Sequence, residues 1–222
     1  MTRASIAGLF AAALTLTAFA DPVAPERKVE GRAIVSAREP GARIEMPAAV
    51  RYVGADRFVL YGMADCELHA FVEADADKKV ERLYWIQFER YLDSRPELHH
   101  RYDSPRQVVL GGQDFYLDTW LDAPDDERTP GSDGEHIRAL IGAKGYRLPP
   151  NRMSVRLVHL LDEAKRKELM LIYSEDLEPT GYAPKDLREG GARHGEWAAL
   201  EGALVERALS SFSLQFVEEA KP

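Results

Sequence analysis

The chain has 222 residues with a single cysteine, and its 29 Lys and Arg residues against 37 Asp and Glu residues give a formal charge of -8. An acidic chain has no positive field to attract nucleic acid or an anionic membrane surface, and one cysteine cannot build a disulfide framework or a cysteine zinc site. With 45% hydrophobic and 30% charged residues, the composition is typical of a soluble globular domain.

The first twenty residues have the pattern of a secretory signal peptide. Arg3 precedes the apolar run 6–17, and the small-residue pattern Ala18-Phe19-Ala20 follows it. The run is too short and too rich in alanine to favour the alternative, an uncleaved membrane span of roughly 20 residues. We therefore predict cleavage near Ala20, a periplasmic or secreted location, and no transmembrane segment.

Residues 21–30 follow the predicted signal and carry two prolines and five charges without periodicity. Such a segment favours a flexible, solvated leader over packed structure. The remaining residues, 31–222, are predicted to form a single globular domain, because a chain of this size can bury roughly 70% of its unfolded surface in one core.

Between residues 34 and 92 the patterns are those of antiparallel strands joined by turns. Alternation over 66–73 predicts a half-buried strand, with Cys66 on the apolar side and Glu67 on the other. A polar turn at 75–79 leads into the run 80–92, which is apolar on both faces and therefore typical of a central strand covered on both sides. Shorter strands are expected at 34–53, in pieces, and at 58–61.

Two segments have helical patterns. Ser132 and Glu135 form a capping box, and Gly145 is placed to end the first helix in the left-handed conformation. The second helix is predicted from Glu196 to about Ser211 by an apolar stripe at helical spacing. A further turn of helix is expected at 184–188.

The other strands complete the predicted fold class. They are expected at 108–110, 115–121, 152–161, 167–173 and 212–217. Many antiparallel strands followed by helix, hairpin, helix and strand indicate an α+β domain, with one antiparallel sheet flanked by helices as in an α/β/α sandwich. A β-barrel-like sheet with two helices is the competing architecture.

Two residues are candidates for acid–base chemistry, although no established catalytic motif is present in the sequence. His159 shares an apolar strand face with Val155 and Leu157, so it is either a core residue or a proton-transfer group. Glu201 falls about 40° from Trp197 on the last helix, inside the apolar stripe. It either reaches water or lines an internal polar site.

Three aromatic residues, Trp85, Tyr91 and Trp120, are candidate contacts for a small apolar ligand, with plain core packing as the alternative. The acidic loop 118–135 has oxygen ligands that suit calcium, but its spacing favours a solvated loop. Adjacent His99 and His100 point to opposite sides of an extended chain, so no metal site is predicted. No cofactor is predicted either. Cys66 is expected to be a small core residue.

The stretch 203–214, Ala-Leu-Val-Glu-Arg-Ala-Leu-Ser-Ser-Phe-Ser-Leu, resembles the closing helix and strand entry of PsbP-like periplasmic and lumenal domains. The resemblance covers only these residues. It implies an antiparallel sheet between helices and a non-enzymatic accessory or binding role, and it carries over no functional residue.

Two functions stay open at this point. The export signal, the sizeable core and the missing motifs favour a non-enzymatic binding or accessory protein of the cell envelope, with a small apolar ligand or an envelope protein as its partner. The alternative is a periplasmic hydrolase or isomerase that uses a carboxylate and a histidine from distant segments, namely Glu201 and His159.

Overall fold

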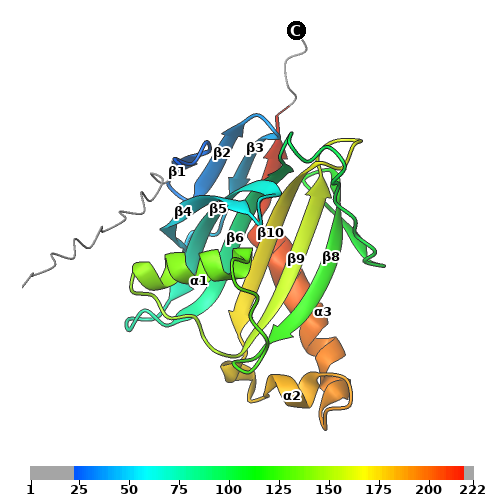
Figure 1. Ribbon diagram of the computed structural model, residues 1–222. Helices are drawn as coiled ribbons and strands as arrows, with labels where there is room; N and C mark the ends of the chain where they lie inside the picture. The colour runs from blue at the N-terminus through cyan, green and yellow to red at the C-terminus, as the bar shows by residue number, and fades with distance from the viewer. Residues whose placement is uncertain (1–22, 218–222) are drawn as a thin grey trace, which may run out of the picture.

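A seven-stranded antiparallel sheet forms the centre of the computed structural model, which describes residues 23–217 (Figure 1). Its strands lie in the order β4-β5-β6-β10-β9-β8-β7. Their bounds are Arg51–Leu60 (β4), Ala64–Ala74 (β5), Val80–Tyr91 (β6), Gln107–Leu110 (β7), Gln113–Asp122 (β8), Arg152–Leu160 (β9) and Lys167–Asp176 (β10). The predicted hairpins are confirmed as β5–β6 and β9–β10. The predicted signal peptide, residues 1–20, lies outside the described residues.

A second sheet of four short strands, absent from the predicted single-sheet fold, packs against the large one. Its order is β1-β2-β3-β11, and its strands are Lys28–Glu30 (β1), Ala33–Ala37 (β2), Gly41–Glu45 (β3) and Ser213–Phe216 (β11). The prediction of a flexible leader over residues 21–30 is wrong for residues 28–30, which form β1. Backbone pairing of β1 with β2 orders these charged residues although they bury little apolar surface.

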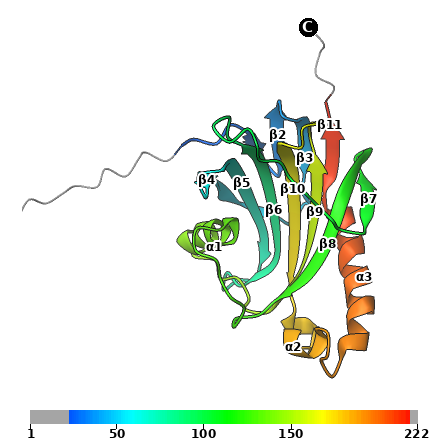
Figure 2. The same cartoon turned by 45° about the vertical axis from the view of Figure 1, so that its right-hand side comes forward.

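Helices cover both faces of the large sheet, which confirms the α+β class. Helix α1 (Asp133–Ala143) lies on one face, and the long helix α3 (His194–Ser211) lies on the other, together with the small sheet (Figure 2). A 3-10 turn, η1 (Glu178–Thr180), and the short helix α2 (Pro184–Leu187) precede α3. No helix within residues 23–217 is long and apolar enough to cross a membrane.

The two faces of the large sheet carry separate apolar cores. On the α3 face, Tyr84 and Ile86 of β6 pack with Leu204 of α3 and with the small sheet. On the α1 face, Leu83 and other residues of β6 pack with Ile137 of α1. Alternate residues of β6 thus enter different cores, as predicted for a strand covered on both sides. Within the described residues neither sheet closes on itself, so the barrel alternative is wrong.

The ends of α1 follow the predicted capping signals. Ser132 is the N-cap, and its side chain accepts a hydrogen bond from the backbone N–H of Glu135 at 3.3 Å. Gly145, just after the helix, has a φ of 77°, which lies in the left-handed region that glycine adopts without a steric penalty. The N-terminal end of α1, which Ser132 caps, borders the cavity described below.

The burial of the side chains on one face of β5 differs from the prediction. Glu67 and His69 are only 2% and 0% exposed, although the alternating pattern placed them on the polar side of a half-buried strand. The N-terminal segment lies over this side, and the backbone N–H groups of Glu26 and Arg27 donate to the Glu67 carboxylate. A polar side chain becomes buried here because its hydrogen-bond partners come from a segment 40 residues away.

Candidate functional site

A cavity of about 240 Å³ opens on the α1 face of the large sheet. Helix α1 crosses the β4 and β5 side of this face, and no helix of the described chain crosses β8 and β9 there (Figure 1). The cavity lies beside the first turns of α1, at the boundary between the covered and uncovered parts. Its volume is slightly below the range of about 300–1,000 Å³ typical of drug-sized ligands, so it suits a small molecule.

The strand register explains why the sheet surface is hollow at this point. Leu83, Ser174, Ser154 and Trp120 form one row across β6, β10, β9 and β8. Two small serines between two large side chains leave a depression. The two hydroxyls lie 2.8 Å apart and hydrogen bond to each other, so both stay satisfied although the serines are buried.

Apolar side chains form most of the floor and walls of the cavity. Trp85 lies in the next row along the sheet, directly opposite Ile172 of β10, and Trp120 borders the other side. Met170 and Ile137 add further apolar surface. Two indole rings facing one small cavity are suited to an aromatic or aliphatic ligand body.

Three arginines, Arg138, Arg152 and Arg156, also line the cavity. Arg152 pairs with Asp122 at 3.3 Å, and Arg156 pairs with Asp118 at 2.7 Å. Arg138 of α1 forms no ion pair with any residue of the described range. Burial, followed by the positive charges of Arg128 and Arg152, lowers the pKa of the Arg138 guanidinium. The carboxylates of Glu135 and Asp122 act in the opposite direction. An anion at this end of the cavity would therefore meet a guanidinium that forms no direct ion pair within residues 23–217.

Asp133, the first residue of α1, contributes a carboxyl group to the cavity wall. Burial raises the pKa of this carboxyl, although the backbone N–H of Gly134 and the charge of Arg156 act in the opposite direction. No histidine among residues 23–217 lines the cavity. On α1, His136 instead stacks on Phe58 and contacts Asp56 at 2.7 Å. The cavity thus has one perturbed carboxyl and no acid–base partner of the predicted kind.

Hydrogen bonds connect the cavity to a buried polar cluster on the same face. The indole N–H of Trp85 donates to Gln87 at 3.1 Å, and the Gln87 amide donates to Glu89 at 3.1 Å. Beside Glu89, the Tyr102 hydroxyl donates to Glu168 at 2.7 Å, and the guanidinium of Arg156 lies over the Tyr102 ring. Burial and the charge of Glu168 raise the pKa of Glu89.

Comparison of the chain with protein-family models, curated proteins and solved structures finds no match. The PsbP-like resemblance of residues 203–214 therefore stays a prediction. The cavity beside α1 is therefore described from its own residues alone. Two of the three aromatic candidates, Trp85 and Trp120, line this cavity. Tyr91, the third, instead packs its ring against that of His100 in a tilted arrangement, at a centroid distance of 4.5 Å.

The two residues predicted for acid–base chemistry are not brought together. Glu201 accepts a hydrogen bond from Thr119 and pairs with Arg106 at 2.9 Å. His159 contacts the backbone oxygen of Asp114 at 2.9 Å. Thr119 and Asp114 are five positions apart on β8, which corresponds to about 16 Å along a strand. Both groups also lie on the α3 side of the sheet, away from the cavity.

Other sequence candidates have structural roles in this fold. Cys66 is buried and unbridged, as predicted, and burial raises the pKa of its thiol. Carboxylates of the acidic loop pair with separate arginines, since Asp126 contacts Arg188 at 2.7 Å and Asp118 contacts Arg156. They do not converge on one point. His100 is only 5% exposed, and it contacts the Tyr91 ring and the Glu168 carboxylate.

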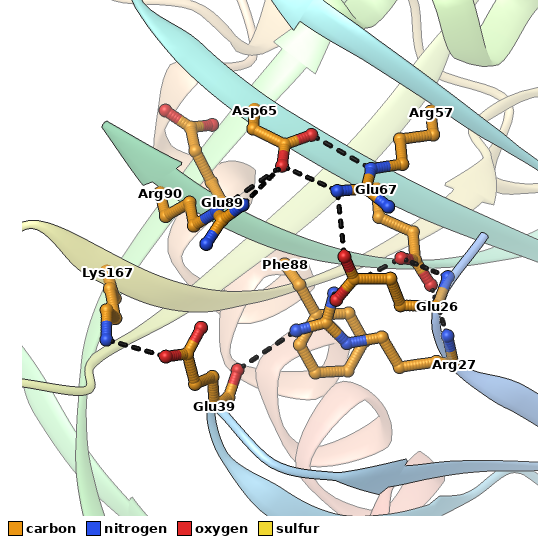
Figure 3. A pocket seen from close by; sticks show the side chains of 10 residues that line it. All are labelled: Glu26, Arg27, Glu39, Arg57, Asp65, Glu67, Phe88, Glu89, Arg90 and Lys167. Carbon is orange, nitrogen blue, oxygen red and sulfur yellow. Dashed lines mark hydrogen bonds and ion pairs between the residues drawn. The ribbon is translucent and has the colours of Figure 1, made fainter. Parts of the chain in front are cut away.

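A network of ion pairs lies on the opposite face of the sheet and attaches the N-terminal segment to it (Figure 3). Glu67 lies at its centre and accepts hydrogen bonds from the backbone N–H groups of Glu26 at 2.7 Å and Arg27 at 2.9 Å. His69 lies 2.8 Å from the same carboxylate. The cavity among these residues measures only about 20 Å³, close to the space that one water needs. We assign this network to stability rather than to ligand binding.

Proposed function

We propose that this chain is an exported binding protein that holds a small apolar molecule with an acidic group in the cleft beside α1. The observation that carries the proposal is the combination of two indole walls with Arg138, a cation that forms no direct ion pair within the described residues. An apolar body gains free energy from burial against the indoles, and a carboxylate gains a charge-assisted hydrogen bond from the guanidinium. A role in catalysis finds less support, because Glu201 and His159 lie apart.

Arg138→Gln should weaken the binding of a small carboxylate selectively. We expect isothermal titration calorimetry to show about a tenfold or greater loss of affinity for phenylacetate, because a charge-assisted hydrogen bond contributes about 1.5–3 kcal/mol. Phenylacetamide has nearly the same shape without the charge, so its weaker binding should change little. Arg101→Gln, in a loop that does not line the cavity, serves as the control. Equal losses for both ligands would contradict charge recognition by Arg138.

Export is the part of the proposal that rests on residues 1–20. Three features of the sequence support cleavage after Ala20: the charge of Arg3, the apolar run 6–17, and the small-residue pattern Ala18-Phe19-Ala20. We expect mass spectrometry of the full-length gene product, recovered from the periplasm or the medium of a bacterial host, to give a chain beginning at Asp21. An intact Met1 chain confined to the cytoplasm would contradict export, and it would leave the cleft proposal unaffected.

A further inference from the structure

We propose that Glu89, His100 and Glu168 bind one divalent transition-metal ion. The three side chains each offer one ligand atom, and these atoms lie within 4.8 Å of one another. Donors bonded to one zinc ion at about 2.0–2.2 Å lie roughly 3.5 Å apart in a tetrahedron, so closure requires each pair of donors to approach by at most about 1.3 Å. Glu89 is only partly buried, and rotation of its side chain can supply this movement.

The sheet register forces the two carboxylates together. Glu89 of β6 and Glu168 of β10 are direct cross-strand partners and therefore point to the same face. Like charges in directly opposite positions destabilise an antiparallel pair. Glu168 is 2% exposed, so water does not relieve the repulsion on its side. A cation between the two carboxylates would turn an unfavourable pair into two favourable contacts.

His100 completes the group from a different part of the chain. It belongs to the segment between β6 and β7, and its Nδ1 atom lies 3.0 Å from Oε2 of Glu168. The backbone N–H of His100 donates to Lys165 at 2.7 Å, which holds the residue in place. Among the described residues nothing hydrogen bonds to its Nε2 atom, although the side chain is only 5% exposed. A bound water or ion would satisfy this ring nitrogen, whereas Nδ1 already faces the Glu168 carboxylate.

Neighbouring polar side chains already orient the proposed ligands. Gln87 donates to Glu89, and the Tyr102 hydroxyl donates to Glu168. Hydrogen bonds of this kind, which fix the direction of a carboxylate, are a regular feature of metal sites. Figure 3 shows the Glu89 carboxylate pointing away from the ion pairs around Glu67, so the two networks do not compete for it.

The ligand set selects the class of metal. One imidazole and two carboxylates suit Zn²⁺, Mn²⁺ or Fe²⁺, whereas Ca²⁺ prefers six to eight oxygen ligands. Two carboxylates also balance the charge of one divalent ion. Because Zn²⁺ binds mixed nitrogen and oxygen sites more tightly than Mn²⁺ does, Zn²⁺ is the more sensitive probe.

The test is metal binding by the EDTA-treated mature protein. We expect calorimetry with ZnCl₂ to show one saturable site per chain, and elemental analysis after desalting to recover about one zinc ion. Glu89→Gln keeps the shape of the side chain and should weaken binding at least tenfold, as should His100→Ala. His99→Ala is the matched control, because His99 is an exposed neighbour outside the cluster, and it should bind zinc as the wild type does.

Three results would overturn the proposal. The first is the lack of saturable zinc binding by the wild-type protein, which would leave only the contact of His100 with Glu168. The second is unchanged binding by Glu89→Gln. The third is a loss in His99→Ala equal to that in His100→Ala, which would place the ion on surface histidines. Circular dichroism verifies the fold of each variant. If His100→Ala does not fold, Glu89→Gln together with the wild-type stoichiometry decides the question.

Discussion

Replacing Glu67 with glutamine should lower the free energy of unfolding by about 3 kcal/mol at pH 7. Burial raises the pKa of this carboxyl, but hydrogen bonds from His69 and from the backbone N–H groups of Glu26 and Arg27 outweigh burial and lower it from 4.5 to about 2. A difference of one pKa unit corresponds to about 1.4 kcal/mol. In the variant, Arg27, whose side chain is only 11% exposed, also loses a buried counterion.

The same substitution predicts a specific pH dependence. A carboxyl whose pKa is lower in the folded protein contributes its full stability above its unfolded value, and loses it as the pH falls through the folded value. For Glu67 this window runs from 4.5 down to about 2. Urea unfolding of the wild type and Glu67→Gln should therefore differ most at pH 7, and the difference should shrink at pH 4 and again at pH 3.

Glu163→Gln is the control for this prediction. Glu163 is exposed in the turn between β9 and β10, and its replacement should change the free energy of unfolding by less than about 0.5 kcal/mol at any pH. A Glu67→Gln penalty that stays the same from pH 7 to pH 3 would mean that the shape of the side chain, rather than its charge, stabilises the N-terminal segment.

Filling the depression in the sheet should abolish ligand binding. In Ser174→Leu a large side chain occupies the space between Leu83 and Trp120 that the two serines leave open. We expect calorimetry to detect no binding of phenylacetate. Ser154 keeps Asp122 as a hydrogen-bond partner at 3.2 Å, so its hydroxyl is not left unsatisfied. Overpacking costs about 1–3 kcal/mol, which a folded domain of this size tolerates.

Ser213→Leu is the matched control, because Ser213 is an exposed position on β11 in the small sheet. It makes the same change in side-chain volume, and phenylacetate affinity should stay at the wild-type value. If Ser174→Leu binds phenylacetate as tightly as this control does, the ligand does not occupy the cleft beside α1.

Local patterns were sufficient to predict most of the large sheet and both long helices. The alternation in β8 and the apolar run in β10 depend on side chains that are close in sequence, so they can be recognised without knowledge of the fold. The small sheet could not be predicted in this way. Its strand β11 pairs with β3 across about 170 positions, as in the register of Leu214 with Ile44, and no local pattern encodes such a pairing.

The candidate site was predictable only in its aromatic part. Trp85 and Trp120 are recognisable as candidates by residue type. Ser154 and Ser174 form part of the cavity only because the strand register pairs them in one row. The same holds for Glu89 and Glu168, which are 79 positions apart and meet only through the register of β6 with β10. A charged residue on an otherwise apolar strand face was the only sequence pattern that could have indicated this pair. Glu89 and Glu168 both occupy such a position.

Tryptophan fluorescence can report directly on the cavity beside α1. It has three tryptophans, and two of them, Trp85 and Trp120, line the cavity. Trp197 lies on α3 and packs against the core of the other face. In a Trp197→Phe variant, all tryptophan emission therefore comes from the walls of the proposed site.

Titration of this variant with phenylacetate is the measurement that tests ligand binding in the cleft most directly. We expect a saturable change in emission intensity, a weaker response to phenylacetamide, and loss of the response in the Trp197→Phe, Ser174→Leu double variant. Emission that stays constant up to millimolar phenylacetate, in a variant shown to be folded, would contradict a binding site for small apolar acids beside α1.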